Sequence, residues 1–136
     1  MEAASEPILV VEDDPDVRDA LVLLLEREGY AVTSVNNGQE ALERLRAEPS
    51  ALVLLDLMLP VMDGFEFRVQ QLQDPALARV PVIVLSSGGD LSRKVEPLHV
   101  DACLSKPLDL DMLLALVARR MGKPAPGAQN ACPNAR

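Results

Sequence analysis

Residues 52–67 have the sequence LVLLDLMLPVMDGFEF, which is the most informative segment of the chain for the fold. Its start belongs to an apolar run at 51–55 that has the length of a buried strand rather than of a helix. Asp56 follows the run directly, and an apolar pattern with helical spacing begins at Phe65. The stretch therefore predicts a buried strand, an acidic side chain at its carboxyl end, and a helix beyond the loop.

Similar apolar runs recur at a regular interval along the chain. They lie at 8–11, 31–35, 51–55, 80–85 and 102–104. Apolar residues at helical spacing mark the helices between and after them: Val17, Leu21, Leu24 and Leu25; Ala41, Leu42 and Leu45; Phe65, Val69 and Leu72; and Leu110, Leu113, Leu114 and Val117. Runs that are apolar throughout, with helices between them, indicate a parallel sheet covered on both faces. The alternation predicts an α/β fold, a (βα)5 doubly wound five-stranded parallel sheet in a single domain.

Residues typical of helix ends bound three of these helices: Asp14, Pro15, Gly29, Asn37, Gly38 and Asp109. The fourth helix of the alternation has to lie within 91–99, which contains Pro97. Proline removes a backbone donor and clashes with the preceding turn, at about 3 kcal/mol inside a helix. We therefore predict a short or irregular fourth helix.

The chain of 136 residues is sized for one domain. We expect an N-terminal extension at 1–6 and a folded domain at 7–121. Residues 122–136, rich in Pro, Ala, Gly and Asn without periodicity, are expected to be a disordered tail or the start of a linker. The net charge of −8 argues against nucleic acid as a direct partner, which would need clustered Lys and Arg. No apolar stretch approaches the roughly 20 residues of a membrane span, and no secretory signal is seen, so we expect a cytoplasmic protein without membrane contact.

Polar side chains follow four of the five predicted strands. Glu12 and Asp13 follow the first strand and Asp56 the third, while Ser86 follows the fourth and Lys106 the fifth. The carboxyl ends of parallel strands meet at one edge of a sheet, and ligands of open α/β sheets bind at that edge. We therefore expect these side chains to lie close together.

Three carboxylates at one edge require a counter-charge, because two unit charges about 4 Å apart repel by roughly 4 kcal/mol at an effective dielectric constant near 20. A divalent cation supplies it, and Mg²⁺ prefers oxygen ligands. Lys106 adds a mobile positive charge, and Ser86 adds a hydroxyl donor. These are the parts that phosphoryl transfer needs, so we infer attack by an aspartate oxygen on phosphorus to give an acyl phosphate.

Four segments in this order resemble the response-regulator receiver domain family of bacterial two-component signalling. They are ILVVEDDPDVR at 8–18, LVLLDLMLPVMDGFEF at 52–67, PVIVLSS at 81–87 and CLSKP at 103–107. The resemblance covers residues 7 to about 121 and implies a flavodoxin/CheY-like fold. It also implies a phosphoprotein switch that accepts its phosphoryl group from a histidine kinase or a histidine phosphotransfer protein. Such a switch catalyses only its own phosphorylation and dephosphorylation, and meets a downstream protein partner on the face of helix 4, strand 5 and helix 5.

The resemblance assigns roles in phosphoryl transfer to three residues. Asp56 matches the phosphoacceptor of the family. Lys106 and Ser86 match the lysine and the switch hydroxyl that bind the phosphoryl oxygens. A cis peptide bond between Lys106 and Pro107 is implied as well.

The resemblance also assigns a metal site. Asp13 and Asp56 match direct metal ligands, whereas Glu12 matches a residue that acts through water. Met58 matches the position that offers its backbone carbonyl to the metal. Mg²⁺ is the expected ion, with Mn²⁺ as a substitute.

One position departs from the family pattern. Three residues before Lys106, the family commonly has Tyr or Phe, and its ring changes rotamer with phosphorylation; this chain has Cys103. A cysteine side chain is too small for that movement. Either the phosphorylation signal reaches the output surface through the loop after the fourth strand and the fourth helix alone, or phosphorylation is only weakly coupled to that surface.

Two other function classes compete with the switch. A binding module that keeps the fold without phosphorylation is supported by Cys103 and the irregular fourth helix, but the intact acidic set opposes it. A small phosphatase of the haloacid-dehalogenase kind also uses an aspartate nucleophile, but its motif needs a second aspartate where Met58 stands. Dinucleotide binding is excluded, because no glycine-rich turn follows the first strand.

Overall fold

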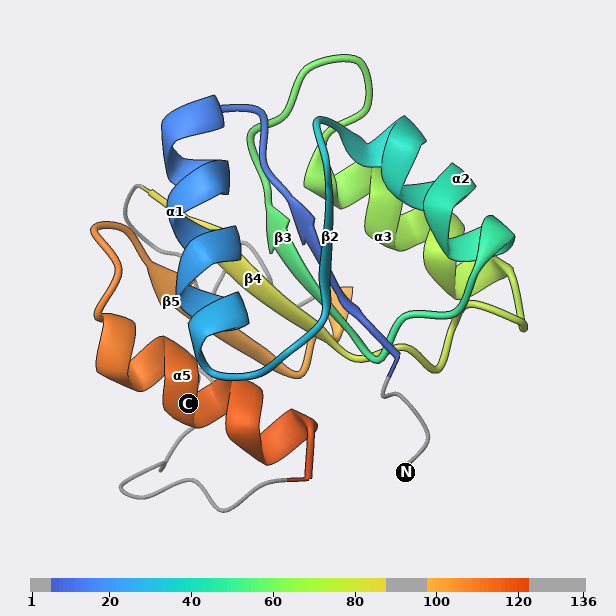
Figure 1. Ribbon diagram of the computed structural model, residues 1–136. Coiled ribbons are helices and arrows are strands. Elements are labelled where there is room, and N and C mark those ends of the chain that lie inside the picture. Colours follow the sequence, from blue (N-terminus) through green and yellow to red (C-terminus); the bar gives the residue numbers. More distant parts are fainter. Residues whose placement is uncertain (1–5, 88–97, 123–136) are drawn as a thin grey trace.

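The computed structural model describes residues 6–87 and 98–122 (Figure 1). The apolar runs form one sheet of five strands: β1 (Ile8–Val11), β2 (Val32–Val35), β3 (Leu52–Asp56), β4 (Val82–Ser86) and β5 (Ala102–Ser105). The helices of the described residues are α1 (Pro15–Arg27), α2 (Gly38–Ala47), α3 (Gly64–Gln73) and α5 (Leu110–Arg120). Neighbouring strands pair in parallel, in the order β2-β1-β3-β4-β5. The predicted doubly wound α/β fold is therefore confirmed.

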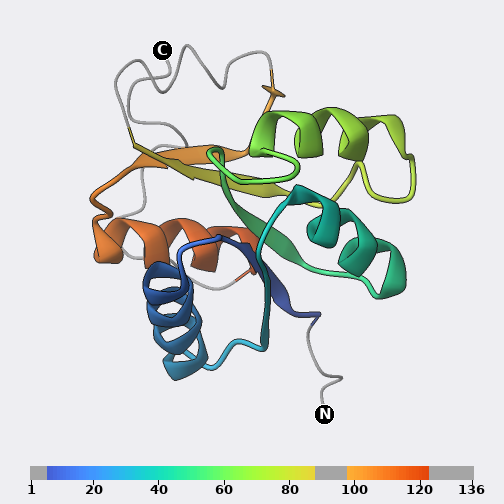
Figure 2. The same cartoon turned by 90° about the horizontal axis from the view of Figure 1, so that it is seen from above.

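Helices cover both faces of the sheet, as its apolar strands require. α1 and α5 lie on one face, and α2 and α3 lie on the other (Figure 2). Leu9 and Val11 of β1 belong to the core that includes Phe67 of α3. Ile8 and Val10 belong to the second core, which α1 and α5 cover. β1, β3 and β4 therefore contribute alternate side chains to the two cores and are packed on both faces.

The predicted cap residues lie where the helices need them. Asp14 accepts two backbone N–H groups of the first turn of α1, and Pro15 is the first residue of that helix. Asn37 and Asp109 cap α2 and α5 in the same way. Gly29, just beyond α1, has a φ of 93°, a left-handed conformation that glycine adopts without strain. These local signals were sufficient to locate three helices.

The predicted fourth helix at 91–99 falls almost wholly on residues 88–97, which lie outside the described residues. A short or irregular helix there therefore stays a prediction, as does the tail from residue 123. Of that region the structure describes Leu98 and His99, and His99 has a positive φ of 53°. No helix in the described ranges is long and apolar enough to cross a membrane.

α3 forms where the sequence predicts it, but of the three residues that marked it only Phe65 packs against the core. Val69 and Leu72 are 46% and 41% exposed, whereas Phe67, Arg68 and Gln71 are buried. Polar side chains are buried only when hydrogen-bond partners satisfy them. Both polar residues have such partners in distant backbone carbonyls, which a local pattern does not reveal. The apolar periodicity therefore indicated the wrong face of this helix.

The loop between β3 and α3 holds a β-branched residue in an unfavourable backbone conformation. Val61 has a φ of 65°. Its side chain is 84% exposed, so it gains little hydrophobic burial to offset the strain of this backbone conformation. Because branched residues are strained at positive φ, we expect Val61→Gly to raise the free energy of unfolding by about 1 kcal/mol. Urea unfolding measures this change. Val69→Gly on the exposed face of α3 is the matched control, and it should lower the free energy of unfolding by about 1 kcal/mol. Equal losses of stability in both variants would show that Val61 is not strained.

Candidate functional site

The candidate site lies at the carboxyl edge of the sheet, where β1 and β3 lie side by side (Figure 1). In the strand order, β2 lies on one side of β1 and β3 lies on the other, so the direction of the connections reverses at β1. The edge between β1 and β3 is therefore the topological switch point of the sheet. Val11 at the end of β1 pairs with Leu55 of β3. Glu12 and Asp56, the next residue of each segment, therefore reach the edge at the same level. Strand register thus brings together acidic residues that are far apart in the sequence.

Three carboxylates meet at this edge. One oxygen atom from each of Glu12, Asp13 and Asp56 lies within 4.8 Å of the other two. Glu12 and Asp56 are buried, at 2% and 5% exposure, whereas Asp13 is exposed. An all-oxygen donor set with one side open to water suits a hard divalent cation, and Mg²⁺ in particular keeps several water ligands. The residues present therefore fit the expected metal ion.

Lys106 brings a positive charge to the two buried carboxylates. It follows the end of β5, and its peptide bond to Pro107 is cis, as the resemblance implied. Its Nζ atom lies 3.1 Å from Oε1 of Glu12 and 3.4 Å from Oδ2 of Asp56. The lysine side chain is itself only 22% exposed. It therefore offsets part of the repulsion between the two carboxylates at short range.

Burial and charge oppose each other in setting the protonation of this cluster. Desolvation raises the pKa of Glu12 above its ordinary value of 4.5, and Asp56 adds to the rise, while the hydrogen bond from Lys106 opposes it. Desolvation by itself would lower the pKa of Lys106, but the hydrogen bonds and charges of Glu12 and Asp56 together hold it above 10.5. Lys106 is therefore charged at neutral pH. Its pairing stabilises the fold below that pKa, and this contribution is lost as the pH rises through it.

The other two predicted site residues lie beside Asp56 and Lys106. The backbone N–H of Met58 donates to Oδ1 of Asp56 at 3.2 Å, and Met58 is 68% exposed. Ser86 is buried, and its hydroxyl donates to the carbonyl of Ser87 at 3.2 Å. The backbone N–H of Lys106 donates to the carbonyl of Ser86 at 2.8 Å. Both Asp56 and Ser86 are the last residues of their strands, one position inside the expected boundary.

The start of α3 packs closely against the backbone of Asp56. The N–H of Gly64 donates to the carbonyl of Leu57 at 2.9 Å. A Cβ atom at Gly64 would lie 2.7 Å from the carbonyl oxygen of Asp56, so a larger residue cannot fit without moving the backbone. Asp63 caps the helix by accepting the N–H of Glu66. The helix is therefore joined directly to the peptide that carries the Asp56 side chain.

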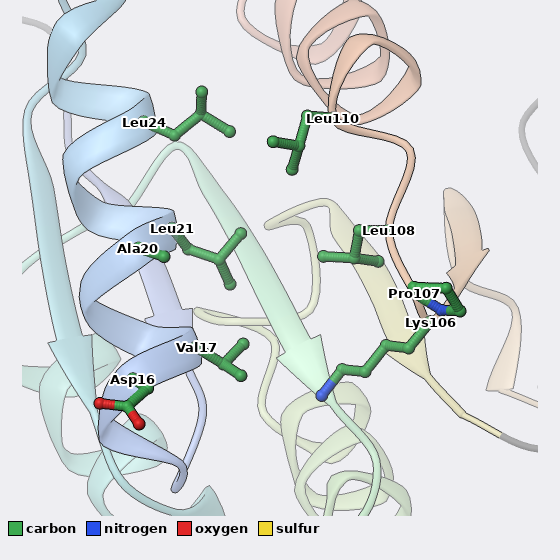
Figure 3. Close-up of a pocket in the computed structure, with 9 residues that line it drawn as sticks. All are labelled: Asp16, Val17, Ala20, Leu21, Leu24, Lys106, Pro107, Leu108 and Leu110. Carbon is green, nitrogen blue, oxygen red and sulfur yellow. The ribbon is translucent and has the colours of Figure 1, made fainter.

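A largely apolar hollow of about 420 Å³ lies next to the site, between α1 and the start of α5 (Figure 3). Its lining consists of Asp16, Val17, Ala20, Leu21, Leu24, Lys106, Pro107, Leu108 and Leu110. Figure 3 shows the α1 leucines facing Leu108 and Leu110, with the Lys106 side chain extending toward the end of β3. The sequence pattern marked Leu21, Leu24 and Leu110 as residues of the apolar faces of their helices. It gave no sign that the two helices leave a gap, and Leu110 is 50% exposed.

The profile of the response regulator receiver domain matches residues 8–118. The transcriptional regulatory protein CseB of Streptomyces coelicolor is 40% identical over 120 residues, which cover 85% of this chain and 50% of that protein. An uncharacterised 14.6 kDa protein of Leptolyngbya boryana is 40% identical over 118 residues, which cover 84% of this chain and 88% of that protein. The chain therefore spans about half the length of CseB but most of the smaller relative.

Solved structures agree with this match. The receiver domain of a sensor histidine kinase from Pseudomonas aeruginosa PAO1 has a TM-score of 0.80 and 28% identity, with 88% of this chain and 100% of that chain covered. That domain holds a magnesium ion coordinated in its active site cleft. A putative response regulator from Chloroflexus aurantiacus has a TM-score of 0.80 and 27% identity, with 88% and 99% covered.

A parallel sheet in the order 2-1-3-4-5 with an acidic cluster at its switch point defines a receiver-type α/β domain. With the match over residues 8–118, the chain belongs to the response regulator receiver domain family of two-component systems, whose members act as phosphoacceptor switches.

Proposed function

We propose that this chain accepts a phosphoryl group on Asp56 and thereby switches its contacts with other proteins. The supporting observation is the position of the Asp56 carboxylate, which lies 3.4 Å from the Lys106 ammonium and within 4.8 Å of the acidic oxygens of Glu12 and Asp13. The receiver domain would comprise residues 7–121, after an extension at 1–6. Residues 122–136 would form a tail or the start of a linker.

In the proposed reaction, an Oδ atom of Asp56 attacks the phosphorus of a phosphohistidine. The new O–P bond forms as the N–P bond breaks, and the electron pair of that bond returns to the imidazole of the donor. Lys106 turns from the Asp56 carboxylate to an oxygen of the transferred group, and the Ser86 hydroxyl donates to another. Both residues are joined through the Lys106 N–H to Ser86 carbonyl bond, so they can respond together.

Asp13, Asp56 and the Met58 carbonyl would hold Mg²⁺, or Mn²⁺ in its place, with Glu12 acting through water. When bound, the ion supplies positive charge that offsets the repulsion between the carboxylates and the incoming phosphoryl oxygens. The exposed position of Asp13 leaves one side of the cluster open to water and to a donor.

Intact mass after incubation with acetyl phosphate tests this proposal. We expect a phosphoryl adduct on the wild-type protein with Mg²⁺, and no adduct when Mg²⁺ is chelated or when Asp56→Asn is used. A folded wild-type protein that gains no adduct with Mg²⁺ present would favour a binding module that works without phosphorylation.

The chain would work as a switch rather than as an enzyme on other substrates, catalysing only its own phosphorylation and dephosphorylation. We place it in the cytoplasm, where histidine kinases and histidine phosphotransfer proteins present their phosphoryl groups. With a net charge of −8, the chain is not expected to bind nucleic acid itself. The downstream protein would meet the face of the predicted fourth helix, β5 and α5; of these, β5 ends at Ser105, directly before Lys106.

The hollow between α1 and α5 is proposed to receive an apolar side chain of the phosphoryl donor. Its wall includes Lys106, which bonds Asp56, so a protein that reaches Asp56 is brought over the hollow. We expect Leu110→Asp to slow transfer from a phosphorylated histidine kinase that is active on the wild type by about tenfold or more, because a buried interface contact is lost. An acidic residue in the first helical turn keeps α5 folded.

Acetyl phosphate provides the internal control, since a small donor needs no docking surface. Phosphorylation of Leu110→Asp by acetyl phosphate should stay within about twofold of the wild type. Leu72→Asp, on the exposed face of α3, should slow neither reaction. Equal slowing with both donors would assign Leu110 to the fold or to the chemistry instead of to docking.

A further inference from the structure

Arg68 is a buried charged residue that the proposed reaction does not use. It lies in α3 and is 4% exposed. Its Nε donates to the carbonyl of Leu98 at 2.9 Å, and its Nη2 donates to the carbonyl of His99 at 2.8 Å. Its Nη1 donates to Oε1 of Gln71 at 2.7 Å. The guanidinium therefore joins α3 to a segment that lies 30 residues further along the chain.

The second polar residue of this network joins the helix to the approach of β4. Gln71 is fully buried, and its Nε2 donates to the carbonyls of Leu77 and Val80 at 3.0 Å each. Arg68 and Gln71 together therefore link one helix to the segments that precede β4 and β5. Apolar residues would fill the same space without these links.

The three hydrogen-bond acceptors of the Arg68 guanidinium described above are all neutral, although burying a charge is costly. Desolvation lowers the pKa of Arg68, and the charge of Asp101 opposes that shift. The guanidinium is planar, and its N–H groups point in fixed directions. Because it donates to the carbonyls of both Leu98 and His99, it holds the backbone there in one orientation. His99 has its positive φ at this point. The arrangement sets the path of the backbone into β5.

The start of α3, about one turn before Arg68, lies against the phosphoacceptor. Gly64, its first residue, has its Cα so close to Asp56 that a Cβ there would come within 2.7 Å of the Asp56 carbonyl oxygen. A shift of the Asp56 backbone would therefore push on α3 directly. About one helical turn separates Gly64, which lies against the Asp56 peptide, from Arg68.

We propose that Arg68 is a positioning residue that carries the state of Asp56 through α3 to the start of β5. This inference rests on the proposed phosphorylation of Asp56. It supplies a connection to β5 that does not depend on a ring at position 103, where Cys103 is buried in the core under α2 and α3. The connection consists of the Gly64 contact, the helix, and the hydrogen bonds from Arg68 to Leu98 and His99.

Hydrogen exchange with the phosphoryl mimic beryllofluoride tests this inference. In the wild type, beryllofluoride with Mg²⁺ should change exchange by about threefold or more in the peptide 57–64 and in the peptide 98–104. In Arg68→Met, the change at 57–64 should persist, while the change at 98–104 should disappear. A role in stability alone would raise exchange in both states and leave the difference between them unaltered.

Arg120→Met is the matched control. Arg120 of α5 also donates to a backbone carbonyl near the start of β5, that of Asp101 at 3.0 Å, and its ion pair is with the Asp101 side chain and not with α3. This variant should keep the beryllofluoride effect at 98–104. Arg68→Lys keeps the buried charge without the guanidinium fork, and we expect it to lose the beryllofluoride effect at 98–104. This variant provides the test if Arg68→Met does not fold.

The outcomes separate this inference from the proposed function. If the wild-type protein binds no beryllofluoride, the proposed function fails and the inference falls with it. If beryllofluoride binds but 98–104 does not respond in the wild type, the inference alone is wrong. It is also wrong if folded Arg68→Met or folded Arg68→Lys responds like the wild type, or if Arg120→Met loses the effect equally.

Discussion

Lys106→Met is expected to lower the free energy of unfolding of the metal-free protein by about 3 kcal/mol at neutral pH. The side chains of Glu12 and Asp56 are 3% and 7% exposed, and the Lys106 ammonium lies within 3.4 Å of both. Without that charge, two carboxylates remain buried beside each other with no cation. Urea unfolding in the presence of a chelator measures the loss.

The loss should depend on pH in a defined direction. Burial already raises the pKa of Glu12 above 4.5, and the bond from Lys106 that opposes this rise is absent from the variant. Above pH 4.5, Glu12 therefore keeps its proton in the folded variant but has released it in the unfolded chain. The free energy of unfolding of the variant then falls as the pH rises above 4.5. The deficit should therefore shrink toward pH 4.5.

Arg44→Met is the control for the lysine variant. Arg44 pairs with Glu48 at 3.1 Å, but both side chains are more than 40% exposed. Removal of this surface pair should change stability by less than about 0.5 kcal/mol. A Lys106→Met protein as stable as Arg44→Met at neutral pH would mean that the carboxylates are not compensated by the lysine.

Asp13→Asn is expected to weaken Mg²⁺ binding by about a hundredfold or more, equivalent to roughly 3 kcal/mol. The variant removes one of three negative charges whose oxygens lie within 4.8 Å of one another. Asp13 is exposed, so its replacement leaves the core packing intact. Titration calorimetry with Mg²⁺ measures the affinity, and the stabilisation by Mg²⁺ against urea provides a second measure.

Asp14→Asn provides the matched control for this experiment. Asp14 accepts the backbone N–H of Asp16 at 2.9 Å as the N-cap of α1. Asparagine caps a helix about as well as aspartate, so the fold is kept while one neighbouring charge is removed. Its Mg²⁺ affinity should stay within about threefold of the wild type. A similar loss in both variants would show a diffuse effect of charge instead of a ligand at Asp13.

The sheet and the acidic edge could be predicted because their signals are local and repeated. Each apolar run is long enough for one strand, and the parallel connection fixes which ends meet. Glu12 and Asp56 therefore converge once the order of β1 and β3 is known. Capping residues such as Asp14 also mark where a helix begins, and each is recognised from its residue type alone.

The orientation of α3 could not be predicted for a physical reason. Its apolar residues Val69 and Leu72 face outward, because Arg68 and Gln71 find partners in backbone carbonyls up to 31 residues away. Hydrogen-bond partners at that separation leave no periodicity in the sequence. The hollow beside Leu110 was missed for a related reason, since its volume depends on how α1 and α5 sit on the sheet.

The location of the acyl phosphate shows whether Asp56 is the phosphoacceptor. Borohydride reduces a phosphorylated aspartate to homoserine, which peptide mass spectrometry assigns to one position. After incubation with acetyl phosphate and Mg²⁺, we expect homoserine at position 56 and at no other acidic position. Homoserine at position 13, or at a surface carboxylate instead of Asp56, would contradict it.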